Sequence, residues 1–148
     1  MLKTIDFAQL YRDHLARSGR RFKTPAEWDS KAANMRLSAL DSAYRRAFVS
    51  KVQCSTEDTV LDIGSGPGTI ALALAPKVKQ VYGLDYSQGM LDAMLQNARE
   101  LQLDNVQPVL ASWDEDWGQV PVVDIAIVSR ASIVADMDDA LTKVNQHA

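Results

Sequence analysis

A glycine-rich stretch that follows a short apolar run carries an acidic residue two positions ahead of its first glycine. Residues 60–68 read V-L-D-I-G-S-G-P-G, so Asp62 precedes Gly64, Gly66 and Gly68. Glycines after a strand allow a tight turn and let a ligand lie close against the backbone. Phosphate is the usual ligand of such turns, yet a carboxylate beside phosphate repels it. A tight structural turn accounts for the glycines alone but leaves Asp62 unexplained.

A second carboxylate, Asp85, ends the next apolar run, 21 residues after Gly64. An acid at this place can accept hydrogen bonds from both hydroxyls of a ribose. It also suits the N-terminus of a helix that begins after Ser87, and both roles are compatible. The dinucleotide pattern G-x-G-x-x-G needs a glycine where Thr69 stands, and no G-K-S or G-K-T follows as in a P-loop. The glycine loop together with Asp85 indicates a nucleoside ligand.

Two further residues with suitable chemistry follow the third apolar run. Trp113 offers a flat apolar face against which an adenine ring could lie. Polar groups near it, such as Ser112, could recognise the edge of that ring. The alternative, which we hold equally open, is that Trp113 covers the edge of the sheet. Trp117 is assigned to packing.

The elements that must position these residues alternate between strands and helices. Strands are predicted at 59–63, 80–84, 106–110 and 122–128, and helices at 2–16, 24–33, 37–52, 69–75, 88–101 and 136–146. Thr24 and Glu27 form a capping box at the start of one helix, and Ser87 caps the helix after the second strand. Alternating strands and helices predict parallel βαβ units with helices on both faces of the sheet.

Ligands of such sheets bind outside the carboxyl ends of the strands. The four predicted strands are followed by Gly64, Asp85, Ser112 and Ser129. Because four separate strand ends meet at one edge of the sheet, their agreement is stronger evidence for a site than any single motif.

Composition narrows the class of protein. The 148 residues suffice for one domain with a core, and no apolar run of about 20 residues predicts a membrane span. The N-terminus lacks the apolar stretch of a signal peptide. The single cysteine, Cys54, cannot form an internal disulfide and has no companions for a metal site, which favours a reducing cytoplasm.

The formal net charge is −3, and the charges are unevenly distributed along the chain. The basic residues are concentrated in its first third. A cluster from Arg17 to Lys23 is either a solvated loop, which we favour, or an anion-binding arm. The net charge does not favour a nucleic-acid partner, so a small-molecule partner is the default expectation.

Three stretches resemble a known family. V-L-D-I-G-S-G-P-G, then V-Y-G-L-D-Y-S-Q-G-M-L, then V-D-I-A-I-V-S-R are similar to the first, second and fourth motifs of Rossmann-like S-adenosylmethionine-dependent methyltransferases. The resemblance covers about residues 38 to 146. It implies an α/β fold with a mostly parallel sheet, an S-adenosylmethionine-binding domain at 37–148 and an N-terminal helical cap at 1–36.

The resemblance also implies roles for individual residues. The loop residues would line the methionine part of S-adenosylmethionine, Asp85 the ribose, and the others the adenine or the methyl group. The implied cofactor-binding set is Asp62, Gly64, Ser65, Gly66, Gly68, Asp85, Tyr86, Met90, Ser112, Trp113 and Ser129. Many relatives carry an acid where Ser112 stands. The substrate pocket would include Tyr11, Trp28 and Arg130, with no assigned general base and no metal.

The chemistry of this cofactor agrees with the residues. S-adenosylmethionine carries no phosphate but has a positive α-ammonium and a positive sulfonium, so Asp62 becomes an asset, either directly or through water. An NAD-dependent oxidoreductase is the less favoured alternative, because it needs a glycine at position 69 and prefers no carboxylate at 62. V-S-R-A stands where methyltransferases of nucleic-acid bases place an N-P-P-Y-like tetrapeptide.

The chain departs from the family pattern in its strand count. The familiar fold has seven strands, whereas four are predicted here, and the apolar strand at 122–128 would form an edge. Three explanations are open: a fragment of a longer enzyme, which we favour, a homo-oligomer paired through that edge, or a cofactor-binding module without catalysis.

Overall fold

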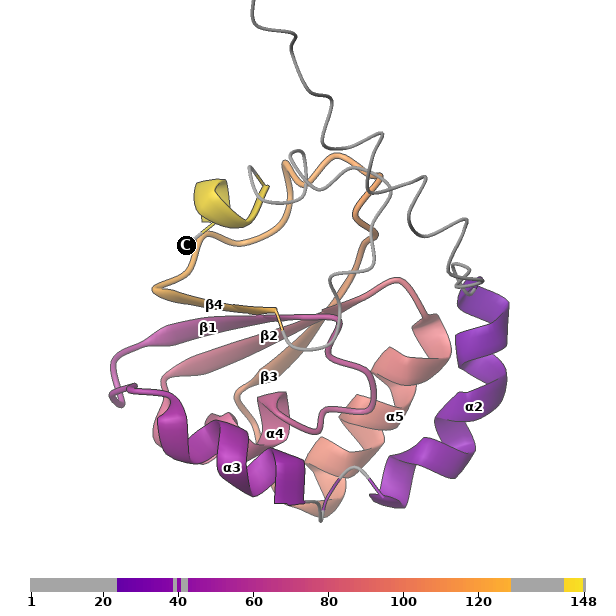
Figure 1. Cartoon of the computed structure of the whole chain (residues 1–148), viewed down its shortest axis with the longest axis horizontal. Coiled ribbons are helices and arrows are strands. Elements are labelled where there is room, and N and C mark those ends of the chain that lie inside the picture. Colours follow the sequence, from indigo (N-terminus) through magenta and orange to yellow (C-terminus); the bar gives the residue numbers. More distant parts are fainter. Residues whose placement is uncertain (1–23, 39, 41–42, 129–142, 148) are drawn as a thin grey trace, which may run out of the picture.

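A four-stranded parallel sheet forms the centre of the molecule in the computed structural model, which describes residues 24–38, 40, 43–128 and 143–147 (Figure 1). The strands are β1 (Thr59–Ile63), β2 (Gln80–Asp85), β3 (Val106–Leu110) and β4 (Ile125–Val128). They lie in the order β3-β2-β1-β4, and every neighbouring pair is parallel. The predicted α/β class and parallel sheet are confirmed.

The register of the sheet brings the carboxyl ends of the strands to one edge. Ile63 at the end of β1 pairs with Leu84 of β2 and with Val128, the last residue of β4. Asp85 at the end of β2 pairs with Leu110 at the end of β3. Loops that leave these four ends therefore start side by side.

Helices cover one face of the sheet, where Figure 1 shows α3, α4 and α5 together. The helices are α2 (Pro25–Ser38), α3 (Ala43–Lys51), α4 (Ala71–Leu74), the 3-10 turn η1 (Ala75–Lys77) and α5 (Gln88–Glu100). Alternate residues of the strands, among them Val60, Val81 and Ile127, face this layer and pack on α4 and α5. Parallel strands buried on both faces are mostly apolar, and β1 follows this pattern at Val60, Leu61 and Ile63 but carries the buried Asp62 between them.

The opposite face of the sheet is covered by the segment that follows β3 and by a helical turn at 143–147. Leu61, Ile63 and Leu84 pack there against Trp117 and Val120. Apolar contacts therefore cover both faces of the sheet.

Several predicted boundaries are wrong. The helix predicted at 24–33 continues to Ser38, and the next begins at Ala43 instead of residue 37. The helix predicted at 69–75 is shorter, because α4 begins at Ala71 and Pro76 lies in the 3-10 turn. The last strand begins at Ile125 instead of residue 122.

The start of the last strand shows why the apolar pattern misled. Val122 is 72% exposed, and Val123 is buried but donates its N–H to the carbonyl of His147, 2.9 Å away, so neither residue joins the sheet. The carboxylate of Asp124 accepts hydrogen bonds from the N–H and hydroxyl of Thr59, at 2.8 and 3.1 Å. These bonds fix the register of β4 beside β1, and the strand is less buried than its sequence predicts.

The predicted helix at 2–16 lies outside the described residues, as does most of the helix predicted at 136–146, of which 143–147 is helical. In the parts of the chain that are described, no helix has the length and apolarity needed to cross a membrane.

Candidate functional site

The glycine loop adopts backbone conformations that side chains disfavour. The φ angles of Gly64, Gly66 and Gly68 are 73°, 55° and 95°, all in the left-handed region. The N–H groups of Gly64 and Ser65 both donate to the carbonyl of Leu84, at 2.7 and 3.0 Å. The loop is therefore held against the end of β2.

The glycines differ in what surrounds them. A Cβ atom on Gly68 would lie 2.8 Å from Cγ of Leu72 and 2.9 Å from Cγ of Met94, so this glycine is needed for packing. A Cβ atom on Gly66 would meet no atom of the described residues within 4 Å. The backbone at Gly66 therefore faces open space in which a ligand can lie against it.

Asp62 is buried beneath the loop, with 2% of its surface exposed. Loss of solvent raises the pKa of its carboxyl to about 7, the backbone N–H of Ala71 lowers the pKa by hydrogen bonding, and the charge of Asp85 raises it. The carboxyl thus holds the first residue of α4 in place. With a pKa of about 7, the carboxyl below the loop changes between its charged and its protonated form near neutral pH.

Ser65 shares this buried region. Its hydroxyl has no hydrogen-bond partner within the described structure, although the residue is only 5% exposed. The hydroxyl lies 3.0 Å from where a Cβ atom on Gly83 would be, so the glycine in β2 leaves room for it. Buried polar groups usually find partners, so an orphaned one beside a glycine loop is an available ligand contact.

Asp85 stands beside the loop as predicted. Its carboxylate accepts hydrogen bonds from the N–H of Gly66 and from the N–H of Ser87, both at 2.9 Å. Loss of solvent raises its pKa, and hydrogen bonds from Ser87, Gly66 and Tyr86 lower it, in that order after burial. The carboxylate thus bridges the turns that leave β1 and β2.

The start of α5 is fixed by two side chains. Ser87 is the N-cap residue, and its hydroxyl accepts from the N–H of Met90 at 3.1 Å, as predicted. The same hydroxyl donates to Asp29 of α2 at 2.5 Å, and Asp29 also accepts from the N–H of Gly89 at 2.7 Å. Sequence analysis missed Asp29, although a glycine in the first turn of a helix is a signal of close approach.

Tyr86, Met90 and Trp28 lie together next to Asp85. Trp28 packs against the cluster of Met90, Ala32 and Ala93. Burial raises the pKa of Tyr86, and a hydrogen bond that it accepts from the Trp28 side chain lowers the pKa by a smaller amount. The structure therefore brings the predicted substrate residue Trp28 beside two predicted cofactor residues.

The segment after β3 begins at the same edge. The N–H of Ala111 donates to the carbonyl of Asp85 at 3.1 Å, so Ser112 and Trp113 follow directly. Trp113 stacks on Trp117 with ring centroids 5.2 Å apart, and the indole N–H of Trp117 donates to the carbonyl of Ser112 at 2.8 Å. Trp117 is buried, which confirms its predicted packing role. One face of Trp113 is thus taken up by Trp117.

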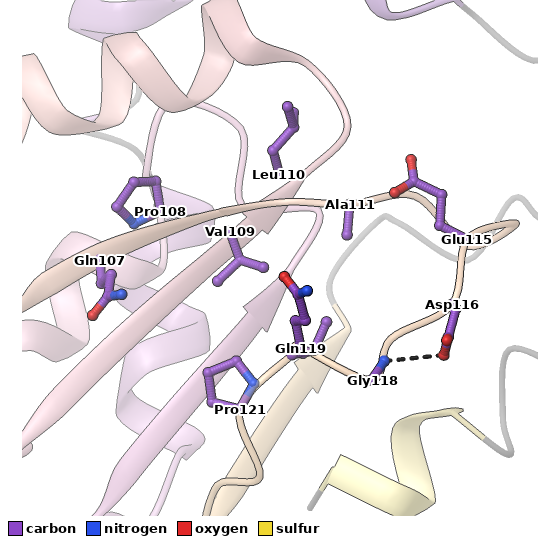
Figure 2. Close-up of a pocket in the computed structure, with 11 residues that line it drawn as sticks. Gln107, Pro108, Val109, Leu110, Ala111, Glu115, Asp116, Gly118, Gln119 and Pro121 are labelled. Carbon is purple, nitrogen blue, oxygen red and sulfur yellow. Dashed lines mark hydrogen bonds between the residues drawn. The ribbon is translucent and has the colours of Figure 1, made fainter.

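The remaining predicted residues, Tyr11, Ser129 and Arg130, lie outside the described residues. A cavity of about 530 Å³ lies elsewhere, between β3 and the loop at 115–121 (Figure 2). None of the predicted site residues lines it. Among the described residues, no group of three or more His, Cys, Asp or Glu side chains is placed to hold a metal ion.

These features define the class of protein. A parallel sheet in the order β3-β2-β1-β4, with a glycine loop after β1 and a buried acid at the end of β2, is the arrangement of a Rossmann-like nucleoside-binding domain.

The comparisons with known proteins narrow the class to a family. Residues 60–148 match the family model of the methyltransferase domain. An uncharacterized protein of Haemophilus influenzae is 39% identical over 142 residues, which are 95% of this chain and 53% of that protein. The chain belongs to the methyltransferase domain family, whose members are transferases and whose cofactor is S-adenosylmethionine.

Two solved structures have a similar fold. The YcgJ protein of Bacillus subtilis superposes with a TM-score of 0.61 at 27% identity, covering 68% of this chain and 43% of that one. Phosphoethanolamine N-methyltransferase 1 of Haemonchus contortus, solved with S-adenosylhomocysteine, gives 0.64 at 17% identity, covering 95% and 29%. The chain spans about half the length of the Haemophilus relative and less than half of either structure.

Proposed function

We propose that this chain binds S-adenosylmethionine at the carboxyl ends of β1, β2 and β3 and transfers its methyl group to a small-molecule acceptor. The observation that carries the proposal is the Asp85 carboxylate, which lies 2.9 Å from the N–H of Gly66 in the glycine loop. This contact joins the predicted ribose-binding acid to the predicted amino-acid-binding loop in one continuous site.

The residues present fit this cofactor. Open space at Gly66 suits a ligand that lies against the backbone, and the buried Ser65 hydroxyl beside it has no partner among the described residues. The two buried carboxyls, Asp62 and Asp85, suit a ligand with positive charge and ribose hydroxyls and disfavour a pyrophosphate. The alternative of an NAD-dependent oxidoreductase loses support for the same reason.

When bound, S-adenosylmethionine supplies a methyl group activated by the positive sulfonium. The chain's own part is to bind and orient, because an in-line displacement gains much of its rate from positioning. The loop backbone would fix the methionine part of the cofactor, and Asp85 would fix its ribose. Trp28 of α2 would form part of the acceptor pocket, together with Tyr11 and Arg130, and Ser129 would lie near the methyl group.

The role of Asp85 is tested by titrating S-adenosylhomocysteine into the full chain in a calorimeter. Asp85→Ala should weaken binding by at least about tenfold, because the ribose hydroxyls lose their acceptor. Asp92→Ala is the matched control, since Asp92 is exposed and, among the described residues, bonds to Gln88 of the same helix. Equal affinity in the Asp85 variant, with the fold intact by circular dichroism, would contradict the proposed site.

The acceptor class is tested by methyl transfer from labelled S-adenosylmethionine into a cell extract separated into small molecules and RNA. Label in the small-molecule fraction is the expected result, and label confined to RNA would overturn it. The cytoplasmic location and the division into a cap at 1–36 and a cofactor domain at 37–148 stay predictions.

A further inference from the structure

Helix α2 is bonded to the cofactor-binding region at both of its ends. Near its start, Asp29 accepts hydrogen bonds from the hydroxyl of Ser87 at 2.5 Å and the N–H of Gly89 at 2.7 Å. A Cβ atom on Gly89 would lie 2.8 Å from the Asp29 carboxylate and 2.9 Å from its Cα. The glycine therefore permits α2 to approach the start of α5 closely.

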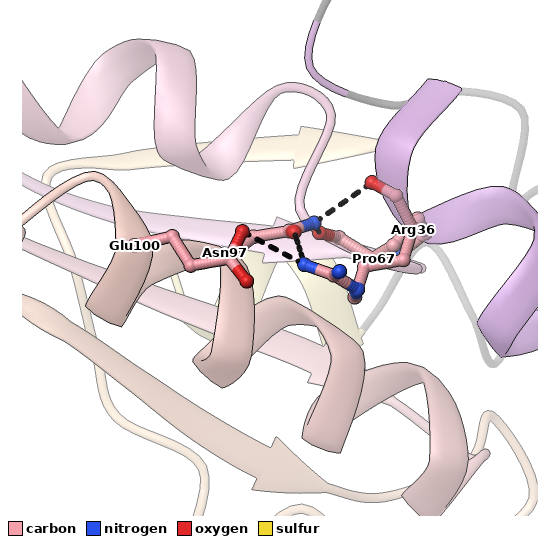
Figure 3. A network of polar contacts seen from close by, with 4 residues as sticks. All are labelled: Arg36, Pro67, Asn97 and Glu100. Atoms are coloured by element: carbon pink, nitrogen blue, oxygen red, sulfur yellow. Dashed lines mark hydrogen bonds and ion pairs between the residues drawn. The ribbon is translucent and has the colours of Figure 1, made fainter.

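The second attachment lies at the last turn of α2 (Figure 3). Arg36 donates from Nη1 to Oδ1 of Asn97 at 3.0 Å and to Glu100 at 2.9 Å. The amide nitrogen of Asn97 donates to the carbonyl of Arg36 at 3.0 Å and to the carbonyl of Pro67 at 3.1 Å. Asn97 is fully buried, so one side chain connects α2, α5 and the glycine loop.

Each attachment is connected by one further hydrogen bond to a different part of the proposed cofactor site. Ser87, which binds Asp29 through its hydroxyl, donates its N–H to Asp85 at 2.9 Å. Asn97 holds Pro67, which stands between Gly66 and Gly68. Trp28, which precedes Asp29, and Ala32, which lies between the two attachments, pack on Met90 and Ala93 of α5.

We propose that α2 is a clamp that holds the ribose-binding turn at 85–87 and the glycine loop at 64–68 in their binding arrangement, with Asp29 and Arg36 as positioning residues. The inference rests on the proposed function. Its consequence is thermodynamic coupling: docking of α2 tightens cofactor binding, and by reciprocity the bound cofactor tightens the docking of α2.

The first test is calorimetric titration of S-adenosylhomocysteine into the full chain and its Asp29 variants. Asp29→Ala should weaken binding by about tenfold, since hydrogen bonds to a charged group are lost. Asp29→Asn keeps an acceptor oxygen and should recover most of the affinity. Asp92→Ala, which alters an exposed carboxylate of α5 that bonds to Gln88, should bind as the unmodified chain does.

The second attachment is tested by a matched pair of variants, Arg36→Ala and Glu100→Ala. Arg36→Ala removes the guanidinium hydrogen bonds to Asn97 and Glu100, keeps the backbone carbonyl that accepts from Asn97, and should weaken S-adenosylhomocysteine binding. Glu100→Ala removes only the partly exposed ion pair and should leave the affinity unchanged, because such pairs contribute little.

Coupling itself is read from amide hydrogen exchange of residues 25–38 with and without S-adenosylhomocysteine. The ligand should slow exchange in α2 of the unmodified chain and do so much less in Asp29→Ala. Unchanged affinity in Asp29→Ala, or exchange in α2 that does not respond to the ligand, would overturn the clamp. Failure of the unmodified chain to bind would instead overturn the proposed function.

Discussion

The Asp62 carboxyl gives the folded chain a pH dependence that can be worked out from its burial. Its pKa is raised to about 7 from an ordinary value of 3.8. Between these values the folded state keeps a proton that the unfolded state has lost, so the contribution of Asp62 to stability is greatest below about pH 4 and falls as pH rises towards 7. At 1.36 kcal/mol per pKa unit, the loss amounts to at most roughly 4 kcal/mol.

This dependence is measured by urea unfolding at pH 5 and pH 8. The unmodified chain should be less stable at pH 8, and Asp62→Asn should show a smaller difference between the two conditions. Asp104→Asn, which alters an exposed carboxylate, serves as the control. An equal pH response in the chain and in Asp62→Asn would show that Asp62 does not stay protonated when folded.

Asp62 should also influence ligand affinity. A positive ligand above the loop favours the ionised carboxylate, so affinity for S-adenosylmethionine should rise as pH increases towards 7 and then level off. Asp62→Asn should bind S-adenosylmethionine more weakly at pH 8 and lose this pH response. Full affinity in the variant, measured by calorimetry, would count against a role for the charge.

At the scale of elements, two glycines of the loop are expected to have different roles: Gly68 in folding and Gly66 in binding. Gly68→Ala should destabilise the chain by about 2 kcal/mol or more, because the new methyl group meets Leu72 and Met94 and φ is 95°. Gly66→Ala faces open space and should cost about 1 kcal/mol of backbone strain while weakening cofactor binding. Thermal unfolding of both variants measures their stability, and calorimetry measures their affinity for the cofactor. The expectation is contradicted if the two variants lose affinity in the same proportion to their loss of stability.

The elements also show what local patterns can and cannot predict. Strands β1 to β3 and the Ser87 cap follow from short runs and capping chemistry, and they were predicted closely. The start of β4 was not, because valines at 122 and 123 have strand propensity but bond elsewhere. Tertiary contacts of Asp124 and His147 decide that boundary.

At the scale of the whole molecule, the contacts between distant segments could not be predicted. Asp29 and Ser87 are 58 residues apart, and Asp29 looks in the sequence like any exposed helix acid. Asn97 gave a weak signal, since it is a polar residue on the apolar stripe of α5 next to Ala98. The meeting of the strand ends at one edge was predictable, because the topology of a parallel sheet fixes it.

Association between chains is also a property of the whole molecule. Within the described residues β4 ends the sheet, and Val128 is 38% exposed. If two chains pair along β4, light scattering should give twice the chain mass of 16.3 kDa, and Val128→Lys should lower it to one chain. A single-chain mass for the unmodified protein would rule out this pairing.

The central claim is that the site made by Asp62, the glycine loop and Asp85 takes S-adenosylmethionine rather than a dinucleotide. The most direct test is calorimetric titration of the folded 148-residue chain with S-adenosylhomocysteine and, separately, with NADH. Saturable heat with S-adenosylhomocysteine and none with NADH is the expected result. Binding of NADH by folded protein that gives no heat with S-adenosylhomocysteine would contradict it.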